Sequence, residues 1–447
     1  MSISAGEKRV GLPPRLFGSS GIRRIADQQL VDLAYKVGVV TGEQYGNIVI
    51  GGDTRVSTPT IKKALFNGIK SSGALCLDAG LLPTPTLAYT TRHFSTGVMV
   101  TASHNPPEYN GIKFWNPDGA AFDDAQETRA EGLINSNKGV SAFNNGAMKI
   151  PKYEGAVNGH LNRILNNFIG SLGRVKVVID CGGGAGSVIT PNLMQKMGTK
   201  AVLINCQPSG TFPRASEPTD TSLKELKQKV VATKARIGLA HDGDADRLIV
   251  VNDRGEIISG DKLLIVLAHY LKVKEVVTTV DASMTIEESG LTVKRTRVGD
   301  SAVSSELKRT GIKFGGEPCG AWIFPSISYC PDGIHAAALV AVLATETNLT
   351  KLVDDIPSYP MLRGSLRYYT APDIYGIEKS LMALNPGSLD KTDGLKCTFK
   401  NGWLLIRFSG TEPKIRLTVE AKSETEARRI YEQADQLIKT ALVKQAL

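Results

Sequence analysis

The sequence predicts an α/β protein built from three α/β units, followed by a small α+β unit at the carboxyl end. Two patterns lead to this prediction. Short β-branched or apolar runs alternate with helix-like segments through most of the chain, at 47–51, 74–78, 97–100, 175–180, 200–205 and 275–280. The last part instead has closely spaced runs that predict a strand meander, at 395–399, 403–408 and 415–421. A helix should follow, capped by Ser423 with Glu426 three residues later.

Breaks in these patterns near residues 149–153, 252–255 and 356–360 divide the chain into four expected domains. They are 1–150, 151–252, 253–358 and the small α+β domain 359–447. A length of 447 residues allows roughly three compact units at about 150 residues each, or more if some are small. Hydrophobic content of 42% and 45 glycines fit an α/β protein with many tight strand-to-helix turns.

Composition argues against several other classes of protein. No apolar stretch approaches the roughly 20 residues of a membrane span, and the first 15 residues lack the apolar core of a signal peptide, so a cytoplasmic protein without membrane contact is expected. The six cysteines form no C-x-x-C pair, which argues against a zinc site or a disulfide framework and predicts reduced thiols. The net charge of +9 is dispersed among acidic residues, which argues against nucleic-acid binding and fits steering of a small anionic substrate.

Residues 101–113 read Thr-Ala-Ser-His-Asn-Pro-Pro-Glu-Tyr-Asn-Gly-Ile-Lys and follow an apolar strand-like run. A serine hydroxyl can carry a phosphoryl group when cations nearby offset the developing charge, and His104 and Lys113 are candidates for this role beside Ser103. The Asn-Pro-Pro segment excludes a helix and predicts an extended turn that presents Ser103 outward. A serine that caps a helix is the alternative for this segment in isolation.

A second loop, Asp242-Gly-Asp-Ala-Asp-Arg247, lies between two apolar runs and offers carboxylates on alternate residues. Asp242, Asp244 and Asp246 would repel one another unless a cation were bound, and Mg²⁺ suits a few carboxylates together with a phosphate oxygen. An EF-hand is excluded, since Arg247 stands where that loop needs glycine. Arg247 would lie beside the ion as a phosphate clamp.

The segment Arg407-Phe-Ser-Gly-Thr-Glu-Pro-Lys-Ile-Arg416 predicts a cradle for a phosphate dianion. Backbone N–H groups at Gly410, the hydroxyls of Ser409 and Thr411, and a guanidinium from Arg407 or Arg416 are suited to such a ligand. A hairpin turn with solvated arginines is an equally common interpretation of this string alone. The glycine-rich run 181–187 does not have dinucleotide-loop spacing, because Ser187 stands at the third glycine position, and tight strand-to-helix packing explains it better.

Taken together, these motifs resemble the α-D-phosphohexomutase superfamily, and the resemblance covers essentially the whole chain. Four family loops occur in the family order: a phosphoserine loop, a metal loop, a sugar loop Gly316-Glu-Pro-Cys-Gly320 and a phosphate loop, at 101–106, 242–247, 316–320 and 407–411. Residues 17–23, Phe-Gly-Ser-Ser-Gly-Ile-Arg, resemble the amino-terminal loop of the family, which makes Arg23 a candidate active-site arginine.

The resemblance implies four domains with mixed sheets around a central cleft, and it implies a mechanism. Phosphorylated Ser103, with Mg²⁺ held by Ser103 and the three aspartates, would donate its phosphoryl group to a hexose monophosphate. The resulting hexose 1,6-bisphosphate would turn end for end and return the other phosphoryl group, with Lys113 or His104 assisting proton transfer. Arg407, Ser409, Gly410, Thr411 and Arg416 would hold the phosphate that does not react, and Glu317 would bind sugar hydroxyls.

Departures from the family pattern bear on the substrate. Cys319 replaces the usual serine of the sugar loop, and Ala321 stands where many relatives have histidine. The segment Arg297-Val-Gly-Asp-Ser301 resembles the form found in phosphoglucosamine mutases, in which Asp300 would lie near a substrate ammonium, although Asp300 could equally cap a helix. The prediction is therefore a phosphoglucosamine mutase that works as a monomer or homodimer on a sugar phosphate.

Three alternatives stay open at this point. One is a phosphomannomutase/phosphoglucomutase of dual or broad specificity. A metal-dependent phosphatase would also use the spacing of the aspartates, and a sugar-phosphate sensor could retain the fold without catalysis.

Overall fold

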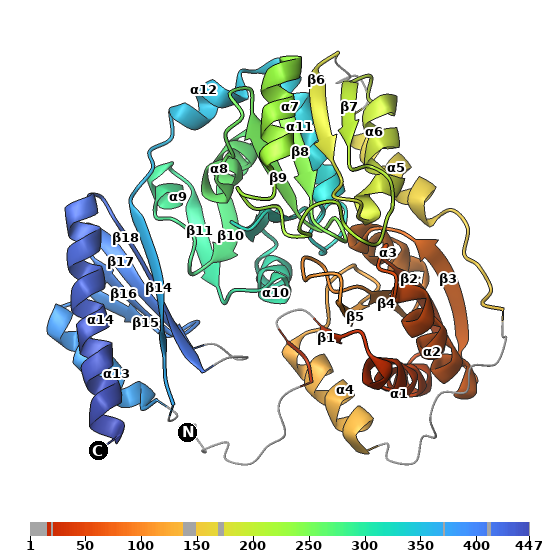
Figure 1. Ribbon diagram of the computed structural model, residues 1–447, viewed down its shortest axis with the longest axis horizontal. Coiled ribbons are helices and arrows are strands. Elements are labelled where there is room, and N and C mark those ends of the chain that lie inside the picture. Colours follow the sequence, from red (N-terminus) through yellow and green to blue (C-terminus); the bar gives the residue numbers. More distant parts are fainter. Residues whose placement is uncertain are drawn as a thin grey trace.

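The computed structural model describes residues 16–18, 21–136, 149–168, 174–369, 372–408 and 413–446. Four sheets with their covering helices follow one another along an arch, from the first domain (red) to the last (blue) (Figure 1). The first three sheets are mixed and the last is entirely antiparallel. The predicted fold class of three α/β domains and a small carboxyl-terminal domain is confirmed.

The first sheet has the strand order β1-β5-β4-β2-β3. Its strands are β1 (Ile22–Ile25), β2 (Asn47–Gly52), β3 (Leu75–Leu81), β4 (Thr96–Val100) and β5 (Tyr109–Trp115), and its helices are α1 (Gln28–Gln44), α2 (Thr58–Ser71), α3 (Thr84–Thr90) and α4 (Asp124–Ser136). Helices α1 and α2 pack backbone to backbone at Gly38 and Gly68, where an added Cβ would lie 2.2 Å from the Leu65 oxygen and 2.1 Å from the Tyr35 oxygen, respectively. β2 and β4 are parallel neighbours, so the loops that follow them leave the sheet at one edge.

The second and third sheets have the orders β7-β6-β8-β9 and β11-β10-β12-β13. The second domain contains α5 (Ala156–Asn167), β6 (Lys176–Asp180), α6 (Thr190–Lys196), β7 (Lys200–Ile204), α7 (Lys224–Thr233), β8 (Ile237–His241) and β9 (Leu248–Asn252). The third contains α8 (Gly260–Tyr270), β10 (Glu275–Thr279), α9 (Thr285–Glu288), β11 (Thr292–Thr296), α10 (Asp300–Thr310), β12 (Gly315–Glu317), β13 (Ala321–Ile323), α11 (Gly333–Glu346) and α12 (Leu349–Asp354). Helix α11 is buried along nearly its whole length and contacts β8, β9 and α6, so one hydrophobic core serves both domains. The domain boundaries expected after residues 150, 252 and 358 stay a prediction.

The carboxyl-terminal sheet has the order β14-β18-β17-β16-β15. Its elements are β14 (Met361–Arg367), α13 (Ile374–Leu381), β15 (Ser388–Asp390), β16 (Leu395–Phe399), β17 (Gly402–Phe408), β18 (Lys414–Ala421) and α14 (Glu424–Ala446). The predicted meander is β16-β17-β18, and the predicted cap is present, with the Ser423 hydroxyl 3.2 Å from the backbone nitrogen of Glu426. Strand β14, which periodicity did not reveal, pairs with β18 over its full length.

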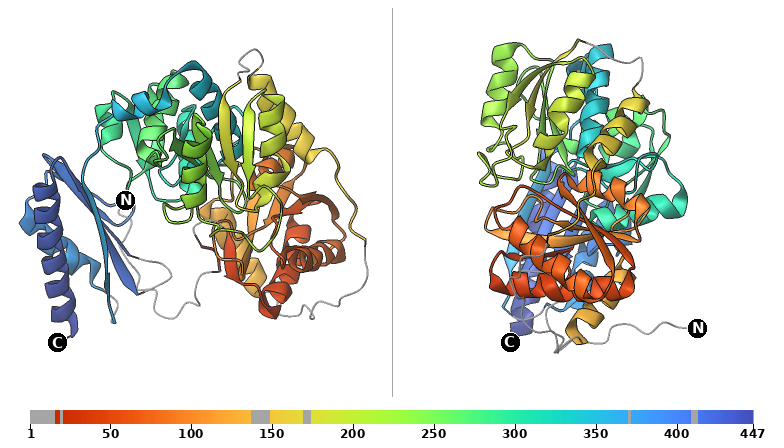
Figure 2. Two further views of the ribbon diagram at one scale, coloured as in Figure 1. Left: turned by 45° about the horizontal axis from the view of Figure 1, so that its top comes forward. Right: turned by 90° about the vertical axis from the view of Figure 1, so that its right-hand side faces the viewer.

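The carboxyl-terminal domain lies beside the third domain in Figure 1 and in the left view of Figure 2. Trp403 and Leu405 pack against Val280 at this contact. The buried Glu420 carboxylate accepts hydrogen bonds from the Met284 backbone nitrogen at 2.8 Å and from the Trp403 indole at 2.7 Å. Glu420 thus joins the last sheet to the third domain.

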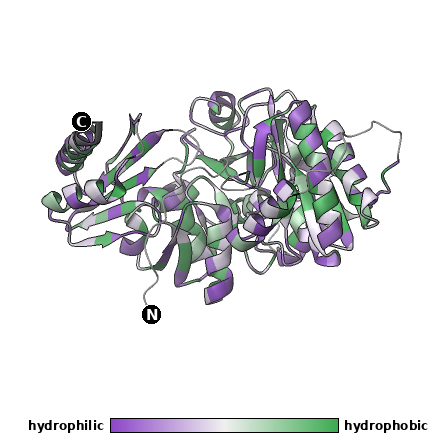
Figure 3. Cartoon of the chain, turned by 90° about the horizontal axis from the view of Figure 1, so that it is seen from below, coloured by the Kyte–Doolittle hydropathy of each residue, from purple (hydrophilic) through white to green (hydrophobic). Residues whose placement is uncertain are grey.

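Hydrophobic residues gather on the strands and inner helix faces, whereas hydrophilic residues lie on the outer faces of the helices (Figure 3). Among the described residues, no helix combines the length and the apolar character needed to cross a membrane.

Candidate active site

The predicted phosphoserine loop connects β4 to β5 at the edge of the first sheet. Ser103 has a φ of 51°, a left-handed conformation that is uncommon for residues other than glycine. Its backbone nitrogen donates to the Thr101 hydroxyl at 2.9 Å, which holds the loop in this shape. The expectation that Ser103 points outward is wrong: the residue is 1% exposed, because the loop turns it toward the second domain.

A buried arginine that sequence reasoning missed supports this loop from behind. Arg55 donates to four backbone carbonyls of the loop and the strand after it, at 2.6–2.9 Å, on Ser103, Asn105, Pro106 and Tyr109. Its Nε donates to Asp53 at 3.0 Å, and Asp53 also accepts from the Thr101 hydroxyl at 2.7 Å. Asp53 and Arg55 follow the parallel strand β2. Functional loops gather at the carboxyl ends of parallel strands, so the position of these two residues could have identified them.

The predicted metal loop is the hairpin between the antiparallel strands β8 and β9. Asp242, Asp244 and Asp246 are all buried, and each offers a carboxylate oxygen that lies within 4.8 Å of the others. The Ser103 hydroxyl donates to Asp242 at 2.9 Å, and the Thr84 hydroxyl donates to Asp244 at 2.6 Å. The loops of two domains therefore meet at this point.

The electrostatics of the three aspartates fit a bound cation. Burial and the neighbouring carboxylates of Asp246 and Asp244 raise the pKa of Asp242 well above its usual range, and burial and Asp244 raise the pKa of Asp246. Burial would also raise the pKa of Asp244, but Lys113 and the Thr84 hydroxyl hold it below the ordinary value. The buried Oδ1 atoms of Asp244 and Asp246 have no hydrogen-bond partner among the described residues. Such unpartnered carboxylate oxygens are the ligands that a hard divalent cation takes.

Lys113 lies on β5, and its ammonium is 3.1 Å from Asp244 and 2.9 Å from Asp246. Burial would lower the pKa of Lys113, but the two carboxylates outweigh it and raise the pKa, so the side chain stays charged. When all three carboxylates are ionised, one ammonium leaves two negative charges, which a divalent cation would balance. His104 is different: burial and the positive charges of Arg247, Arg23 and Lys113 lower its pKa to about 3, so the imidazole is neutral at physiological pH.

A cleft of about 450 Å³ opens beside these two loops. It collects residues from all four domains, namely Arg23, Ser103, His104, Asp246, Arg247, Thr279, Asp281, Val298, Gly299, Asp300, Glu317, Pro318, Cys319, Ala321, Pro331 and Arg363. Eight of these were predicted site residues. Thr279, Asp281 and Arg363 were not predicted, although Asp281 follows the parallel strand β10 and could have been found in the same way as Asp53.

The sugar loop and the residues before α10 form one wall of the cleft. Glu317 is buried and accepts a hydrogen bond from the backbone nitrogen of Gly299 at 2.9 Å. Burial and the nearby Asp300 raise the pKa of Glu317 to about 7. Asp300 is the first residue of α10, whose N-cap is Gly299, and its carboxylate accepts from the Ser301 backbone nitrogen at 2.9 Å and lines the cleft. Cys319 is exposed within the cleft.

The predicted phosphate loop is described only at its two ends. Ser409, Gly410 and Thr411 lie outside the described residues. Arg407 and Arg416 are opposite each other on β17 and β18, and Arg407 pairs with Asp393 at 2.9 Å. Neither arginine lines the cleft in this arrangement, whereas Arg363 on β14 of the same domain does.

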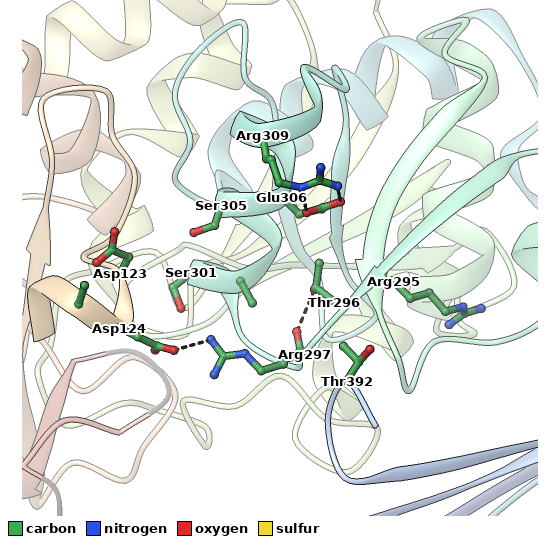
Figure 4. Close-up of a pocket in the computed structure, with 12 residues that line it drawn as sticks. Asp123, Asp124, Arg295, Thr296, Arg297, Ser301, Ser305, Glu306, Arg309 and Thr392 are labelled. Atoms are coloured by element: carbon green, nitrogen blue, oxygen red, sulfur yellow. Dashed lines mark hydrogen bonds and ion pairs between the residues drawn. The ribbon is translucent and has the colours of Figure 1, made fainter. Parts of the chain in front are cut away.

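A second cavity, of about 530 Å³, lies between α4, α10 and the carboxyl-terminal domain (Figure 4). Arg297 reaches across it to Asp124 at 2.9 Å, and Arg309 pairs with Glu306. Because these charged groups neutralise one another, the cavity lacks the one-sided charge of a phosphate site. The Arg297 to Asp124 contact instead links the third domain to the first beside the cleft.

Comparisons with known proteins agree with this geometry. Residues 14–140, 159–255 and 259–359 match the phosphoglucomutase/phosphomannomutase alpha/beta/alpha domains I, II and III, and residues 372–437 match the C-terminal domain of the same family. A "Probable phosphoglucosamine mutase" of Methanocella arvoryzae is 44% identical over 96% of this chain and 98% of its own length. A "Phosphoglucosamine mutase" of Methanococcus maripaludis is 37% identical over 96% of this chain and 99% of its own length.

Solved structures give the same result. A phosphoglucomutase/phosphomannomutase family protein from Burkholderia thailandensis superimposes with a TM-score of 0.83 at 27% identity, covering 96% of this chain and 97% of the other. The resemblance in sequence, the four matching domains and the shared fold lead to one conclusion: this chain belongs to the phosphoglucomutase/phosphomannomutase family and is a phosphohexomutase.

Proposed function

We propose that the chain is a phosphoglucosamine mutase, which moves a phosphoryl group between O6 and O1 of glucosamine phosphate through phosphorylated Ser103. The observation that carries the proposal is the 2.9 Å contact between the Ser103 hydroxyl and Asp242, inside a buried group of three aspartates at the floor of a cleft. A hydroxyl in this position can carry a negatively charged phosphoryl group only where positive charge surrounds it.

The three aspartates and Ser103 would hold Mg²⁺. The carboxylate count, the unpartnered oxygens and the net negative charge support a hard divalent ion that keeps a place for a phosphate oxygen. When bound, the ion supplies electrophilic stabilisation of the transferring phosphoryl group.

The residues of the chain itself account for the movement of the proton. As the bond from phosphorus to the Ser103 oxygen breaks and the bond to the sugar oxygen forms, the sugar hydroxyl releases a proton. Lys113 holds its proton firmly, and His104 Nδ1 lies 3.4 Å from the Ser103 oxygen, so position makes His104 the proposed acceptor. Lys113, Arg247 and Arg23 then supply positive charge around the phosphoryl group.

The cleft must bind the substrate in two orientations. A hexose 1,6-bisphosphate would be the intermediate, and it would also activate the dephosphorylated enzyme. Arg363 lines the cleft opposite the phosphoserine loop and, with Arg407, Arg416 and the hydroxyls of Ser409 and Thr411, forms the proposed anchor for the phosphate that does not react.

Two acids on the cleft wall support glucosamine as the sugar. Asp300 and Glu317 line the same cleft as Ser103 and Arg363, so the amino group at C2 of a bound sugar would meet them there. An ammonium gains more from such carboxylates than a hydroxyl does. The names of the relatives and the Val-Gly-Asp segment point the same way.

The test is a side-by-side measurement of kcat/KM for glucosamine, glucose and mannose 6-phosphates, with Mg²⁺ and a trace of the matching bisphosphate. The proposal predicts the highest value for glucosamine phosphate, with a loss in Asp300→Asn that is larger for glucosamine than for glucose. Equal values for glucose and mannose above glucosamine would favour the mutase of dual specificity instead. Release of free phosphate would indicate a phosphatase, and no turnover would indicate a sensor.

A sugar phosphate is accordingly the proposed partner. Cytoplasmic location, the lack of nucleic-acid and membrane partners, and a monomeric or homodimeric state stay predictions.

A further inference from the structure

Two cysteine thiols meet at the carboxyl end of the second sheet, outside the cleft. Cys181 follows β6 and Cys206 follows the neighbouring parallel strand β7, and their sulfur atoms are 3.3 Å apart. Cys181 is fully buried, whereas Cys206 is only half-buried. All six cysteines are free thiols.

The environments of the two thiols differ in a way that assigns them different reactivity. The hydrogen bond between the two thiols is the main cause that lowers the pKa of Cys206, and the same contact, with burial, raises the pKa of Cys181. The half-buried thiol is therefore the more readily ionised one, and the thiolate is the form that attacks oxidants. A second thiol already in contact can then resolve the oxidised sulfur.

We propose that Cys181 and Cys206 form a reversible oxidation site, which a hydroperoxide converts from two thiols to a disulfide. The Cys206 thiolate attacks the peroxide, the oxygen–oxygen bond breaks, and Cys206 becomes a sulfenic acid while one water or alcohol leaves. The Cys181 sulfur then attacks the Cys206 sulfur, and the sulfenic oxygen leaves as water with the thiol proton. Two thiols lose two electrons and two protons, and the peroxide gains them.

The turn after Cys181 connects this pair to the metal loop. The Gly184 nitrogen donates to the Cys181 oxygen at 2.8 Å, and the next residue, Ala185, donates its backbone N–H to Gly243 at 2.9 Å. The two backbones are closely packed at this contact, since a Cβ on Gly184 would lie 2.6 Å from the Gly243 oxygen. Gly243 lies between the first two aspartates of the metal loop.

The segment after Cys206 also contacts the active-site region, at the support of the phosphoserine loop. Its Phe212 ring lies 5.1 Å from the guanidinium of Arg55, which supports the phosphoserine loop. Closing the sulfur separation from 3.3 Å to the roughly 2 Å of a disulfide shifts both side chains and pulls on the two turns that follow the strands. Since both following segments touch active-site loops, oxidation should displace the aspartates relative to Ser103 and lower turnover.

The experiment treats the full chain with hydrogen peroxide and compares wild type with Cys206→Ser. Non-reducing peptide mapping should find a disulfide between the peptides of Cys181 and Cys206 in the wild type. Mutase turnover should fall by roughly tenfold or more, in line with the effect of small displacements in an active site, and recover with dithiothreitol. Cys206→Ser should keep its turnover under the same treatment. Because the exposed Cys319 is present in both proteins, its own oxidation cannot produce a difference between them.

Three results would overturn the proposal: the linked peptides fail to form while Cys319 is oxidised, they form without loss of turnover, or Cys206→Ser loses activity as the wild type does. Should Cys206→Ser not fold, Cys181→Ala provides the second variant, in which the Cys206 sulfur can be oxidised but cannot be resolved. The peptide map does not depend on turnover, so it tests the disulfide even if the substrate is not glucosamine phosphate.

Discussion

Replacing Arg55 by lysine tests whether a buried guanidinium determines the shape of the phosphoserine loop. The arginine donates to four backbone carbonyls and to Asp53, with its side chain fully buried. Lysine keeps the positive charge but has three donors on one nitrogen, in a geometry that cannot reproduce the planar fork. At least two of the five acceptors then lose their partner inside the protein.

The magnitude follows from these contacts. Each buried acceptor left without a donor costs about 1–3 kcal/mol, so the loss of two should lower the free energy of unfolding of Arg55→Lys by about 2–6 kcal/mol. Arg55→Met also leaves the Asp53 carboxylate without its counter-ion and should cost at least about 3–5 kcal/mol. Because the lost contacts hold the backbone of Ser103 and Asn105, kcat should fall more than KM rises.

Two assays check this reasoning. Denaturant unfolding gives the stability change, and amide hydrogen exchange of the peptide spanning 101–109 shows whether the loss is local to the loop. Arg429→Lys is a matched control, since this exposed arginine pairs with Glu426 and Gln433 on its own helix and should leave stability and turnover nearly unchanged. Normal kcat and unchanged exchange in Arg55→Lys would refute the idea that the guanidinium positions the nucleophile.

Three further predictions concern the cleft directly. Ser103→Ala should abolish phosphorylation and turnover while costing only about 1 kcal/mol of stability; a phosphorylated residue found elsewhere by mass spectrometry in an active variant would contradict this. Removing divalent metal with a chelator should abolish turnover and lower the melting temperature of the wild type. The melting temperature of Asp242→Asn should fall less on chelation, because fewer carboxylates then repel one another. The pKa of Glu317 is raised from an ordinary 4.5 to about 7, so the folded protein binds this proton more tightly than the unfolded chain does. Stability should therefore fall as pH rises from 4.5 to 7, and Glu317→Gln should remove that part of the pH dependence of unfolding. An identical profile in both proteins would be evidence against the shift.

Local sequence patterns predicted most of the strands because each strand is a short apolar run between turn residues. The runs at 395–399 and 403–408 became β16 and β17 almost to the residue. Strand β14 was missed because its residues alternate between half-buried and exposed positions and include two arginines and a glycine. Such an edge strand depends on pairing with β18, which is distant in the sequence.

The candidate site was predictable where one loop holds several reactive groups, as in residues 101–106 and 242–247. Contacts between loops of different domains were not, because spacing along the chain carries no information on them. The Lys113 contact with Asp244 and Asp246 spans more than 130 residues, and it changes the expected role of that lysine from proton transfer to charge balance. The burial of Ser103 likewise depends on the second domain, which the local turn pattern cannot reveal.

The contact between Ser103 and Asp242 has a consequence for biosynthesis. The hydroxyl and its carboxylate partner come from two different domains, 139 residues apart in the chain. A nascent polypeptide that has released only its first domain from the ribosome already carries the serine but none of the aspartates. Phosphate chemistry at that serine therefore has to wait until translation has passed residue 246 and the second domain has docked, so fragments of the enzyme should be inert individually and regain activity only when they are combined.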